Sequence, residues 1–175
     1  MAVDISREFK AINIALLTVS DTRGPDEDTS GDILADRIET AGHRLAARAL
    51  ERDDADIIAA RLNNWIDDSG VDAVVITGGT GLTGRDVTPE ALDRVKEKDI
   101  PGFGELFRWL SYQTIGTSTV QSRACAVVSR GTYIFALPGS NGAVKDGWDG
   151  ILAEQLDSRN RPCNFVELMP RLREK

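Results

Sequence analysis

The chain has 175 residues, near the size of one ordinary domain, with 21 basic and 28 acidic side chains and a net charge of −7. This acidic balance argues against a nucleic-acid-binding protein, which normally presents a basic face. One histidine, His43, and two cysteines, Cys125 and Cys163, cannot build a zinc site of four cysteines or of two cysteines and two histidines. We therefore expect chemistry based on carboxylates, hydroxyls, lysines, arginines or backbone amides.

The pattern along the chain predicts a single cytoplasmic domain over residues 1–175, with a core over about residues 11–157 and a polar tail over 158–175. Residues 1–10 mix charges and lack the pattern of a secretory signal. No apolar run approaches the roughly 18 residues of a membrane span, so we expect no membrane partner. Two cysteines without a regular spacing are typical of a reducing compartment.

The chain begins with a strand and a helix separated by an acidic loop. Residues 12–19 are apolar and β-branched, which predicts a buried strand of the kind found in parallel sheets. The acidic residues 26–28 are expected to be solvated. Thr29 or Ser30 is expected to cap a helix that ends at Gly42.

A second strand and helix precede the clearest strand of the chain. Residues 43–50 predict a strand that is more polar and therefore nearer a sheet edge. Asp53 or Asp54 is expected to start a helix with an apolar stripe. Residues 71–76 then predict a buried strand, and the glycine-rich segment 77–81 follows at once.

The next elements are two helices and a strand pair. Thr88 is expected to cap a helix over about residues 88–98, with a proline at its first position. Apolar residues at helical spacing predict another helix over 103–110, after a Pro-Gly break. Residues 124–128 and 132–137 predict two strands joined by an Arg-Gly turn.

Ser140 is expected to cap the last long helix, which continues through Leu152. Strands that alternate with helices predict an α/β fold with a sheet covered on both faces. In such sheets, ligands bind beyond the carboxyl ends of the strands. Three strand exits, at residues 18–24, 77–86 and 137–142, are rich in small or polar residues and are expected to meet there.

The segment 77–81 reads Thr-Gly-Gly-Thr-Gly and carries the strongest signal for a ligand. Gly78, Gly79 and Gly81 remove side chains where the backbone could approach an anion. The spacing is neither that of the dinucleotide fingerprint nor that of a P-loop. Spacing alone leaves two readings open, an anion-binding loop or a tight glycine turn without a ligand.

Two carboxylates follow the glycine segment. Asp86 lies just before the predicted helix, and Glu90 lies in its first turn, where the helix dipole favours an anion. Asp86 could hold Mg²⁺, which proteins commonly bind through one or two carboxylates together with substrate phosphates. A cation would let an acidic protein bind a nucleotide. Alternatively, both carboxylates are solvated and support the helix end.

Other polar residues near the strand ends have two readings each. Asp21 and Asp53 could supply a further carboxylate, or could serve as caps and solvated loop residues. Arg123 could bind a phosphate or carboxylate as a fork, or form a surface salt bridge. Lys145 is more simply a solvated lysine, and His43 an ordinary strand residue.

Eight ordered segments of the chain resemble the MogA/MoaB family of molybdenum-cofactor biosynthesis proteins, and the resemblance covers about residues 11–168. The matching segments are residues 17–21, 28–31, 76–82, 85–91 (Arg-Asp-Val-Thr-Pro-Glu-Ala), 101–108, 115–119, 121–124 and 136–140 (Ala-Leu-Pro-Gly-Ser). The Gly-Thr-Ser-Thr segment at 116–119 and the Arg-Pro-Cys-Asn segment at 161–164 look more like the MoaB branch.

The resemblance implies a three-layer α/β/α molybdopterin-binding fold with a mostly parallel sheet. It also implies an adenylyltransferase, which joins AMP from Mg-ATP to the phosphate of molybdopterin and releases pyrophosphate. The family's catalytic, metal-holding aspartates fall on Asp86 and, by a looser match, Asp53. The implied ligand contacts are Gly78, Gly79, Thr80, Gly81, Ser122, Arg123 and Ser140. Mg²⁺ is the implied cofactor, with ATP and molybdopterin as substrates.

Two other functions remain open at this stage. One is a non-catalytic molybdopterin-binding or assembly protein of the MoaB type. The other is a relative of the competence-associated domains that share this fold and act on nucleotide pyrophosphates. The single-domain length and the Gly-Thr-Ser-Thr segment argue against the second, and the intact Arg-Asp-Val-Thr-Pro motif favours the enzyme.

The family resemblance also implies a homotrimer or homohexamer. Residues 103–112 carry four of the aromatic side chains. At helical spacing, Phe103 and Phe107 suit the core, whereas Trp109 and Tyr112 point elsewhere, which would suit a subunit contact. The simpler alternative is one well-buried helix.

Overall fold

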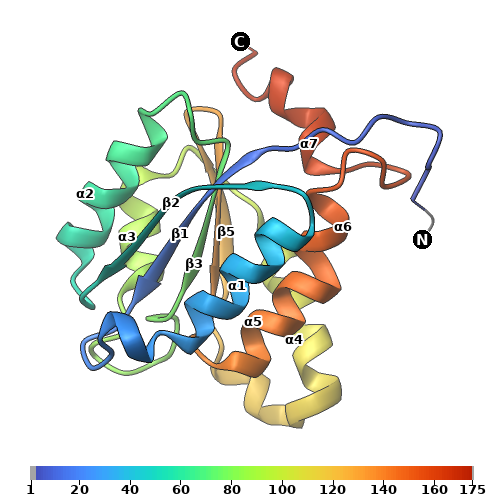
Figure 1. Cartoon of the computed structure of the whole chain (residues 1–175). Helices are drawn as coiled ribbons and strands as arrows, with labels where there is room; N and C mark the ends of the chain where they lie inside the picture. The colour runs from blue at the N-terminus through green and yellow to red at the C-terminus, as the bar shows by residue number, and fades with distance from the viewer. Residues whose placement is uncertain (1–2, 175) are drawn as a thin grey trace.

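The computed structural model describes residues 3–174, which form a six-stranded sheet in the order β2-β1-β3-β6-β5-β4 (Figure 1). The strands are β1 (Asn13–Val19), β2 (Arg44–Glu51), β3 (Ala73–Thr77), β4 (Lys98–Asp99), β5 (Cys125–Ser129) and β6 (Thr132–Leu137). β1, β2, β3 and β6 pair in parallel, whereas β5 is antiparallel to both β6 and β4. The predicted α/β fold with a mostly parallel sheet is confirmed.

The helices cover both faces of this sheet, as Figure 1 shows. They are α1 (Thr29–Thr40), α2 (Ala55–Ile66), α3 (Thr88–Val95), α4 (Pro101–Ile115), α5 (Asn141–Gly147), α6 (Ala153–Gln155) and α7 (Phe165–Leu168). α2 and α3 pack on one face, and α1, α4 and α5 pack on the other. The result is the expected three-layer α/β/α arrangement.

Each layer of helices encloses its own apolar core, and β1 shows how one strand serves both. Ile14 and Leu16 point into the core beneath α1, α4 and α5, whereas Ala15 and Leu17 point into the core beneath α2 and α3. All four side chains are fully buried. Successive side chains of a strand face opposite sides, so a strand buried on both faces is apolar along most of its length.

Two helix starts follow the prediction. Asp54 caps α2, because its carboxylate accepts hydrogen bonds from the amides of Asp56 and Ile57. Ser140 caps α5 in the same way, through the amide of Ala143. The helical path continues from α5 through a π-helical turn and α6, which agrees with the predicted long last helix.

The predicted start of α1 was wrong. Asp28, not Thr29 or Ser30, is the cap, and its Oδ1 accepts from the amide of Gly31 at 2.9 Å. Asp28 is also buried rather than solvated, because its Oδ2 accepts from Thr18 Oγ1 at 2.7 Å and from Arg48 at 2.8 Å. This carboxylate therefore fastens the start of α1 to β1 and β2.

Three smaller boundaries also differ from the prediction. Val87 precedes α3, and Thr88 is already helical, with its hydroxyl donating to the carbonyl of Gly78 at 2.9 Å. α3 ends at Val95, so residues 96–98, which were predicted to be helical, instead lead into the short strand β4. Pro101 starts α4 instead of separating two helices, since proline fits the first helical position.

His43 is buried just before β2 rather than within it, and its Nδ1 accepts from the amide of Ile12 at 3.3 Å. Burial lowers the pKa of His43, against the opposing charge of Asp157.

The segment beyond residue 157 contributes to the core through Val166 on α7. None of the helices formed by residues 3–174 has the length and apolar run required to cross a bilayer.

Two glycines of α4 give a matched test of how closely this helix packs on β5. A Cβ on Gly104 would lie 2.4 Å from the carbonyl oxygen of Ala124, whereas a Cβ on Gly102 would meet nothing within 4 Å. We predict that Gly104→Ala lowers the free energy of unfolding by about 1–3 kcal/mol. Gly102→Ala should leave it unchanged or raise it by up to about 1 kcal/mol. Equal effects in urea denaturation would contradict this packing.

Candidate functional site

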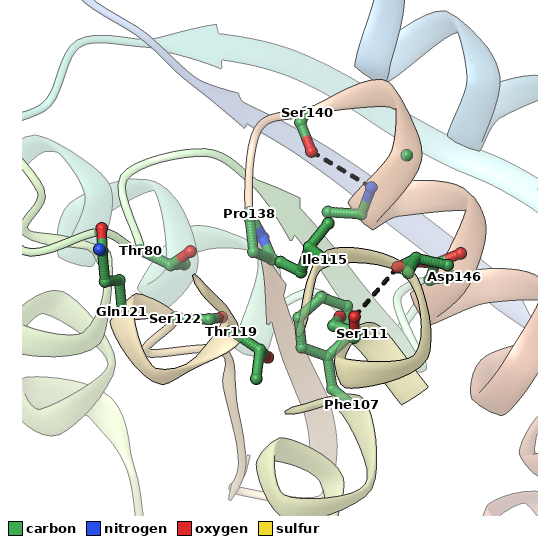
Figure 2. A pocket seen from close by; sticks show the side chains of 14 residues that line it. Thr80, Phe107, Ser111, Ile115, Thr119, Gln121, Ser122, Pro138, Ser140 and Asp146 are labelled. Atoms are coloured by element: carbon green, nitrogen blue, oxygen red, sulfur yellow. Dashed lines mark hydrogen bonds between the residues drawn. The ribbon is translucent and has the colours of Figure 1, made fainter. Parts of the chain in front are cut away.

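The carboxyl ends of β1, β3 and β6 meet as predicted, and two adjoining pockets open there. The polar pocket, of about 430 Å³, lies between the loop after β1 (residues 20–23), the glycine loop (residues 78–81), Asp53 and Asp86. The apolar pocket, of about 410 Å³, lies between the glycine loop, α4, the 3₁₀ segment Gly116–Gln121 and the start of α5 (Figure 2). Four residues line both pockets: Thr80, Gly81, Pro138 and Ser140.

The first two glycines of the loop are required by the protein's own packing. Gly78 has a φ of +105°, and a Cβ there would lie 2.1 Å from the carbonyl oxygen of Val19. Its amide donates to the carbonyl of Leu137 at 3.0 Å, so this N–H is not available to an anion. Gly79 has a φ of +64°, and a Cβ there would lie 2.4 Å from Thr88 Oγ1. Close packing at the strand ends therefore explains the glycines at 78 and 79 without any ligand.

The third glycine makes room for Asp86. A Cβ on Gly81 would lie 2.7 Å from Asp86 Oδ2. That oxygen accepts from the amide and the hydroxyl of Thr83, at 2.8 and 2.6 Å. Burial acts to raise the pKa of Asp86, but these hydrogen bonds, one from the Gly81 amide and the charge of Arg123 outweigh it and lower the pKa. Asp86 is thus held as a carboxylate beside the glycine loop.

Asp53 lies in the same pocket, but its pKa shifts in the opposite direction from that of Asp86. It exchanges hydrogen bonds with Asp21, since the Asp21 amide donates to Asp53 Oδ2 at 2.9 Å and the Asp53 amide donates to Asp21 Oδ1 at 3.2 Å. This exchange ties the loop after β1 to the loop after β2. Burial raises the pKa of Asp53, and the negative charges of Asp21 and Asp86 raise it further. The pocket therefore concentrates negative charge.

Arg123 orders the loop that carries Asp86. Its guanidinium donates to the carbonyl oxygens of Gly81, at 2.7 Å, and Asp86, at 2.6 Å, and it forms an ion pair with Glu90. The hydrogen bond from Arg123 lowers the pKa of Glu90, and burial opposes this effect. In this structure Arg123 and Glu90 are thus engaged with each other and with the loop, and Arg123 lines neither pocket.

Thr80 presents an unused polar atom where the pockets meet. The residue is only 2% exposed, and its Oγ1 has no hydrogen-bond partner among residues 3–174. A buried hydroxyl without a partner costs free energy unless a ligand or water completes it. Figure 2 shows Thr80 and Gln121 at one end of the apolar pocket and Asp146 at the other.

The wall of the apolar pocket contains both expected and unexpected residues. Ser122 and Ser140, which the sequence suggests as ligand contacts, line it. Phe107, Ser111 and Thr119 also line it, and the sequence does not mark them as site residues. The Gly-Thr-Ser-Thr segment could have indicated Thr119, but Phe107 is indistinguishable in sequence from an ordinary core residue. Lys145 lines neither of the two pockets.

No three His, Cys, Asp or Glu side chains within residues 3–174 are arranged to hold a metal ion by themselves. Asp53 and Asp86 face the same pocket, and the charge of Asp86 contributes to the raised pKa of Asp53. Two carboxylates match the partial ligand set that Mg²⁺ takes from proteins when phosphates supply the remainder. Asp53 and Asp86 could therefore supply only part of a metal's ligand set, and a phosphate ligand would have to supply the rest.

Comparison with known proteins agrees with this geometry. The family model described as "Probable molybdopterin binding domain" matches residues 15–158. Molybdenum cofactor biosynthesis protein B of Escherichia coli K12 is 49% identical over 161 residues, covering 92% of this chain and 95% of that protein.

Solved structures agree as well. The crystal structure of a molybdenum cofactor biosynthesis protein B has a TM-score of 0.86 and 32% identity, covering 97% of this chain and 100% of its own. That of the tungsten cofactor synthesizing protein MoaB from Pyrococcus furiosus has a TM-score of 0.79 and 34% identity, covering 94% and 99%. The chain belongs to the MogA/MoaB family of molybdenum-cofactor biosynthesis proteins, in its MoaB branch.

Proposed function

We propose that this protein is a molybdopterin adenylyltransferase, which joins AMP from Mg-ATP to the phosphate of molybdopterin and releases pyrophosphate. The observation that carries the proposal is the pair of adjoining pockets, one apolar and one acidic, which share the glycine loop and Ser140. A transfer between two substrates requires two binding sites whose ligands meet at the reacting atoms. These pockets meet at Thr80 and Gly81.

The two pockets differ in the ligand that each suits. The apolar pocket has the flat ring of Phe107 and several hydroxyls in its wall, which suits a heteroaromatic ring such as a pterin. The polar pocket contains the carboxylates and arginines, which suits the phosphates of a nucleotide and their cation. Thr80 Oγ1, which lacks a protein partner, lies where a phosphate joining the two would pass.

Mg²⁺ fits the polar pocket because of its charge. Asp21, Asp53 and Asp86 line this pocket, and burial, together with the negative charges of Asp21 and Asp86, raises the pKa of Asp53. Asp53 and Asp86 would hold the cation. When bound, Mg²⁺ supplies the positive charge that neutralises the phosphates of the nucleotide. The same cation offsets the net charge of −7, which otherwise repels an anionic substrate.

The reaction requires positioning more than a strong base. The terminal phosphate of molybdopterin is already ionised at neutral pH, so one of its oxygens can attack the α-phosphorus of ATP directly. A P–O bond forms there, the P–O bond to the β-phosphate bridge breaks, and pyrophosphate leaves with that electron pair. The rigid glycine loop and the fixed Asp86 hold the reacting groups in line. A histidine is not needed.

The alternative is a MoaB-type protein that binds molybdopterin without adenylylating it. It would use the apolar pocket in the same way and leave the acidic pocket without a role. The reciprocal Asp21–Asp53 hydrogen bonds and the fixed Asp86 favour the enzyme, because they organise carboxylates that pterin binding alone does not require.

A cytoplasmic location is part of the proposal and agrees with the free thiols of Cys125 and Cys163.

We propose further that the protein is a homotrimer or homohexamer. Trp109 and Tyr112 are 62% and 53% exposed on α4, whereas Phe103 and Phe107 are buried, so the predicted division of this helix is confirmed. Leu106, Ile115 and Val120 are also exposed nearby. Exposed aromatic and aliphatic side chains that gather on one helix and its extension are typical of an interface.

The adenylyltransferase proposal predicts a product. Purified protein, molybdopterin, ATP and Mg²⁺ should yield adenylylated molybdopterin, detected by chromatography and mass spectrometry. Asp86→Asn should lower turnover by about 10²-fold or more, with pterin binding retained, because it removes a metal-holding charge. Asp36→Asn, on the exposed side of α1, is the matched control. Tight pterin binding without product would instead support the non-catalytic protein.

The burial and acidic neighbours of Asp53 predict that removing its charge stabilises the folded protein. Because its pKa is raised in the folded state, the ionised form costs stability at neutral pH, and this cost disappears as pH falls toward the ordinary value of 3.8. Without Mg²⁺ at pH 7, Asp53→Asn should raise the melting temperature by about 1–3 °C. The gain should shrink on acidification. A lower melting temperature for this variant at pH 7 would contradict the charge repulsion.

The assembly proposal predicts a mass of three or six times 19.0 kDa by light scattering. Trp109→Lys should shift the mass toward the monomer, because it places a charge in the apolar contact. Arg52→Glu, an exposed change outside α4, serves as a control for altered charge. A monomeric mass for the unsubstituted protein at micromolar concentration would rule out the assembly.

A further inference from the structure

The polar pocket contains two cationic side chains, Arg23 and Arg85, in very different settings. Arg85 is 72% exposed and lies 3.8 Å from a carboxylate oxygen of Asp21. Arg23 is half-buried, and it forms no ion pair with any carboxylate of residues 3–174, although Asp21, Asp53 and Asp86 line the same pocket. An acidic protein thus keeps one partly desolvated guanidinium without a counter-ion beside its glycine loop.

Arg23 is held in place from both ends. Its amide donates to Ser20 Oγ at 3.2 Å, which fixes the backbone of the loop after β1. Its guanidinium donates to Ser30 Oγ and to the carbonyl oxygen of Gly139, both at 3.1 Å. These neutral acceptors orient the group without neutralising its charge, and they use two of its five N–H donors. The remaining donors are available to an anion.

The guanidinium lines the polar pocket close to the residues that this pocket shares with the apolar pocket. Gly139 packs against the glycine loop, since a Cβ on Gly139 would lie 3.3 Å from the Cα of Gly78. The same Cβ would lie 3.9 Å from a terminal nitrogen of Arg23. The neighbours of Gly139, Pro138 and Ser140, line both pockets. A phosphate between a ligand in one pocket and a ligand in the other would pass this position.

We propose that Arg23 is a phosphate-binding residue, which contacts a substrate phosphate through the guanidinium donors that the protein leaves unused. This inference rests on the proposed function for the identity of the substrates, whereas the contact itself requires only a phosphate group in the polar pocket. An ion pair between Arg23 and a phosphate would compensate a half-buried charge that no carboxylate compensates. It would also give the acidic pocket a direct contact for an anion, separate from Mg²⁺.

The phosphate could belong to the pterin substrate or to the nucleotide, and binding measurements distinguish them. We would titrate the protein with 6-hydroxymethylpterin and its phosphate ester, and with adenosine and AMP, in one Mg²⁺-containing buffer. The quantity compared is the affinity ratio within each pair, because a merely structural role of Arg23 would weaken both members equally. The variants are Arg23→Met and Arg23→Lys. Arg44→Met is the control, since Arg44 is exposed outside both pockets and its guanidinium donates to the side chain of Asn13.

The unsubstituted protein should prefer the phosphate-bearing member of at least one pair by about tenfold or more. Arg23→Met should abolish that preference, Arg23→Lys should keep part of it, and Arg44→Met should leave it intact. The pair that responds identifies the source of the phosphate. An unchanged ratio in Arg23→Met, an equal loss for both members, or no preference in the unsubstituted protein would overturn the proposal.

These outcomes are separable from the proposed reaction because they require no turnover. Loss of the phosphate preference in Arg23→Met, in a protein that forms no adenylylated product, would support the contact and refute only the transfer reaction. Product formation by the unsubstituted protein, with the phosphate preference unchanged in Arg23→Met, would support the reaction and refute the contact.

Discussion

The site depends on one close contact, in which the backbone of Gly78 lies against the end of β1. A Cβ at this residue would meet the Val19 carbonyl at 2.1 Å, so the chain can turn out of β3 only where no side chain is present. The Gly78 amide donates a hydrogen bond to the carbonyl of Leu137 at the end of β6. The Gly78 carbonyl accepts one from the hydroxyl of Thr88 at the start of α3. One residue thereby joins three strand ends and a helix, and the two pockets form around that junction.

The same junction places two carboxylates in one pocket, and their pKa values are shifted in opposite directions. Asp86 is fastened as an anion by Thr83 and by the loop that Arg123 orders, whereas the pKa of Asp53 is raised by burial and by its acidic neighbours. Ionisation of Asp53 therefore costs folding stability, and we expect an amide at this position to stabilise the fold. Such a residue is expected where a cation and its phosphates complete the structure.

Much of this arrangement could be predicted from the sequence. The carboxyl ends of parallel strands share one edge of a sheet, so the sequence predicts that the strand exits at 18–24, 77–86 and 137–142 meet, which places Asp86 beside the glycine loop. Asp53 is implied only by a looser match to the family, because it follows a strand outside those three exits. The burial of Asp28 could not be predicted, because its partners Thr18 and Arg48 come from two other strands. The two-residue strand β4 is polar and exposed, so it carries no apolar pattern. The sequence suggested Arg123 as a ligand contact because it does not show that this guanidinium binds the carbonyls of Gly81 and Asp86 and pairs with Glu90.

We expect the acidic pocket to bind an anionic nucleotide much more tightly when a cation lies between its carboxylates and the phosphates. Calorimetric titration of ATP into the protein, in Mg²⁺ and in EDTA, tests it most directly. The account predicts at least about tenfold tighter ATP binding with Mg²⁺ in the unsubstituted protein, and loss of that difference in Asp86→Asn. Equal affinities with Mg²⁺ and EDTA in the unsubstituted protein would contradict the account.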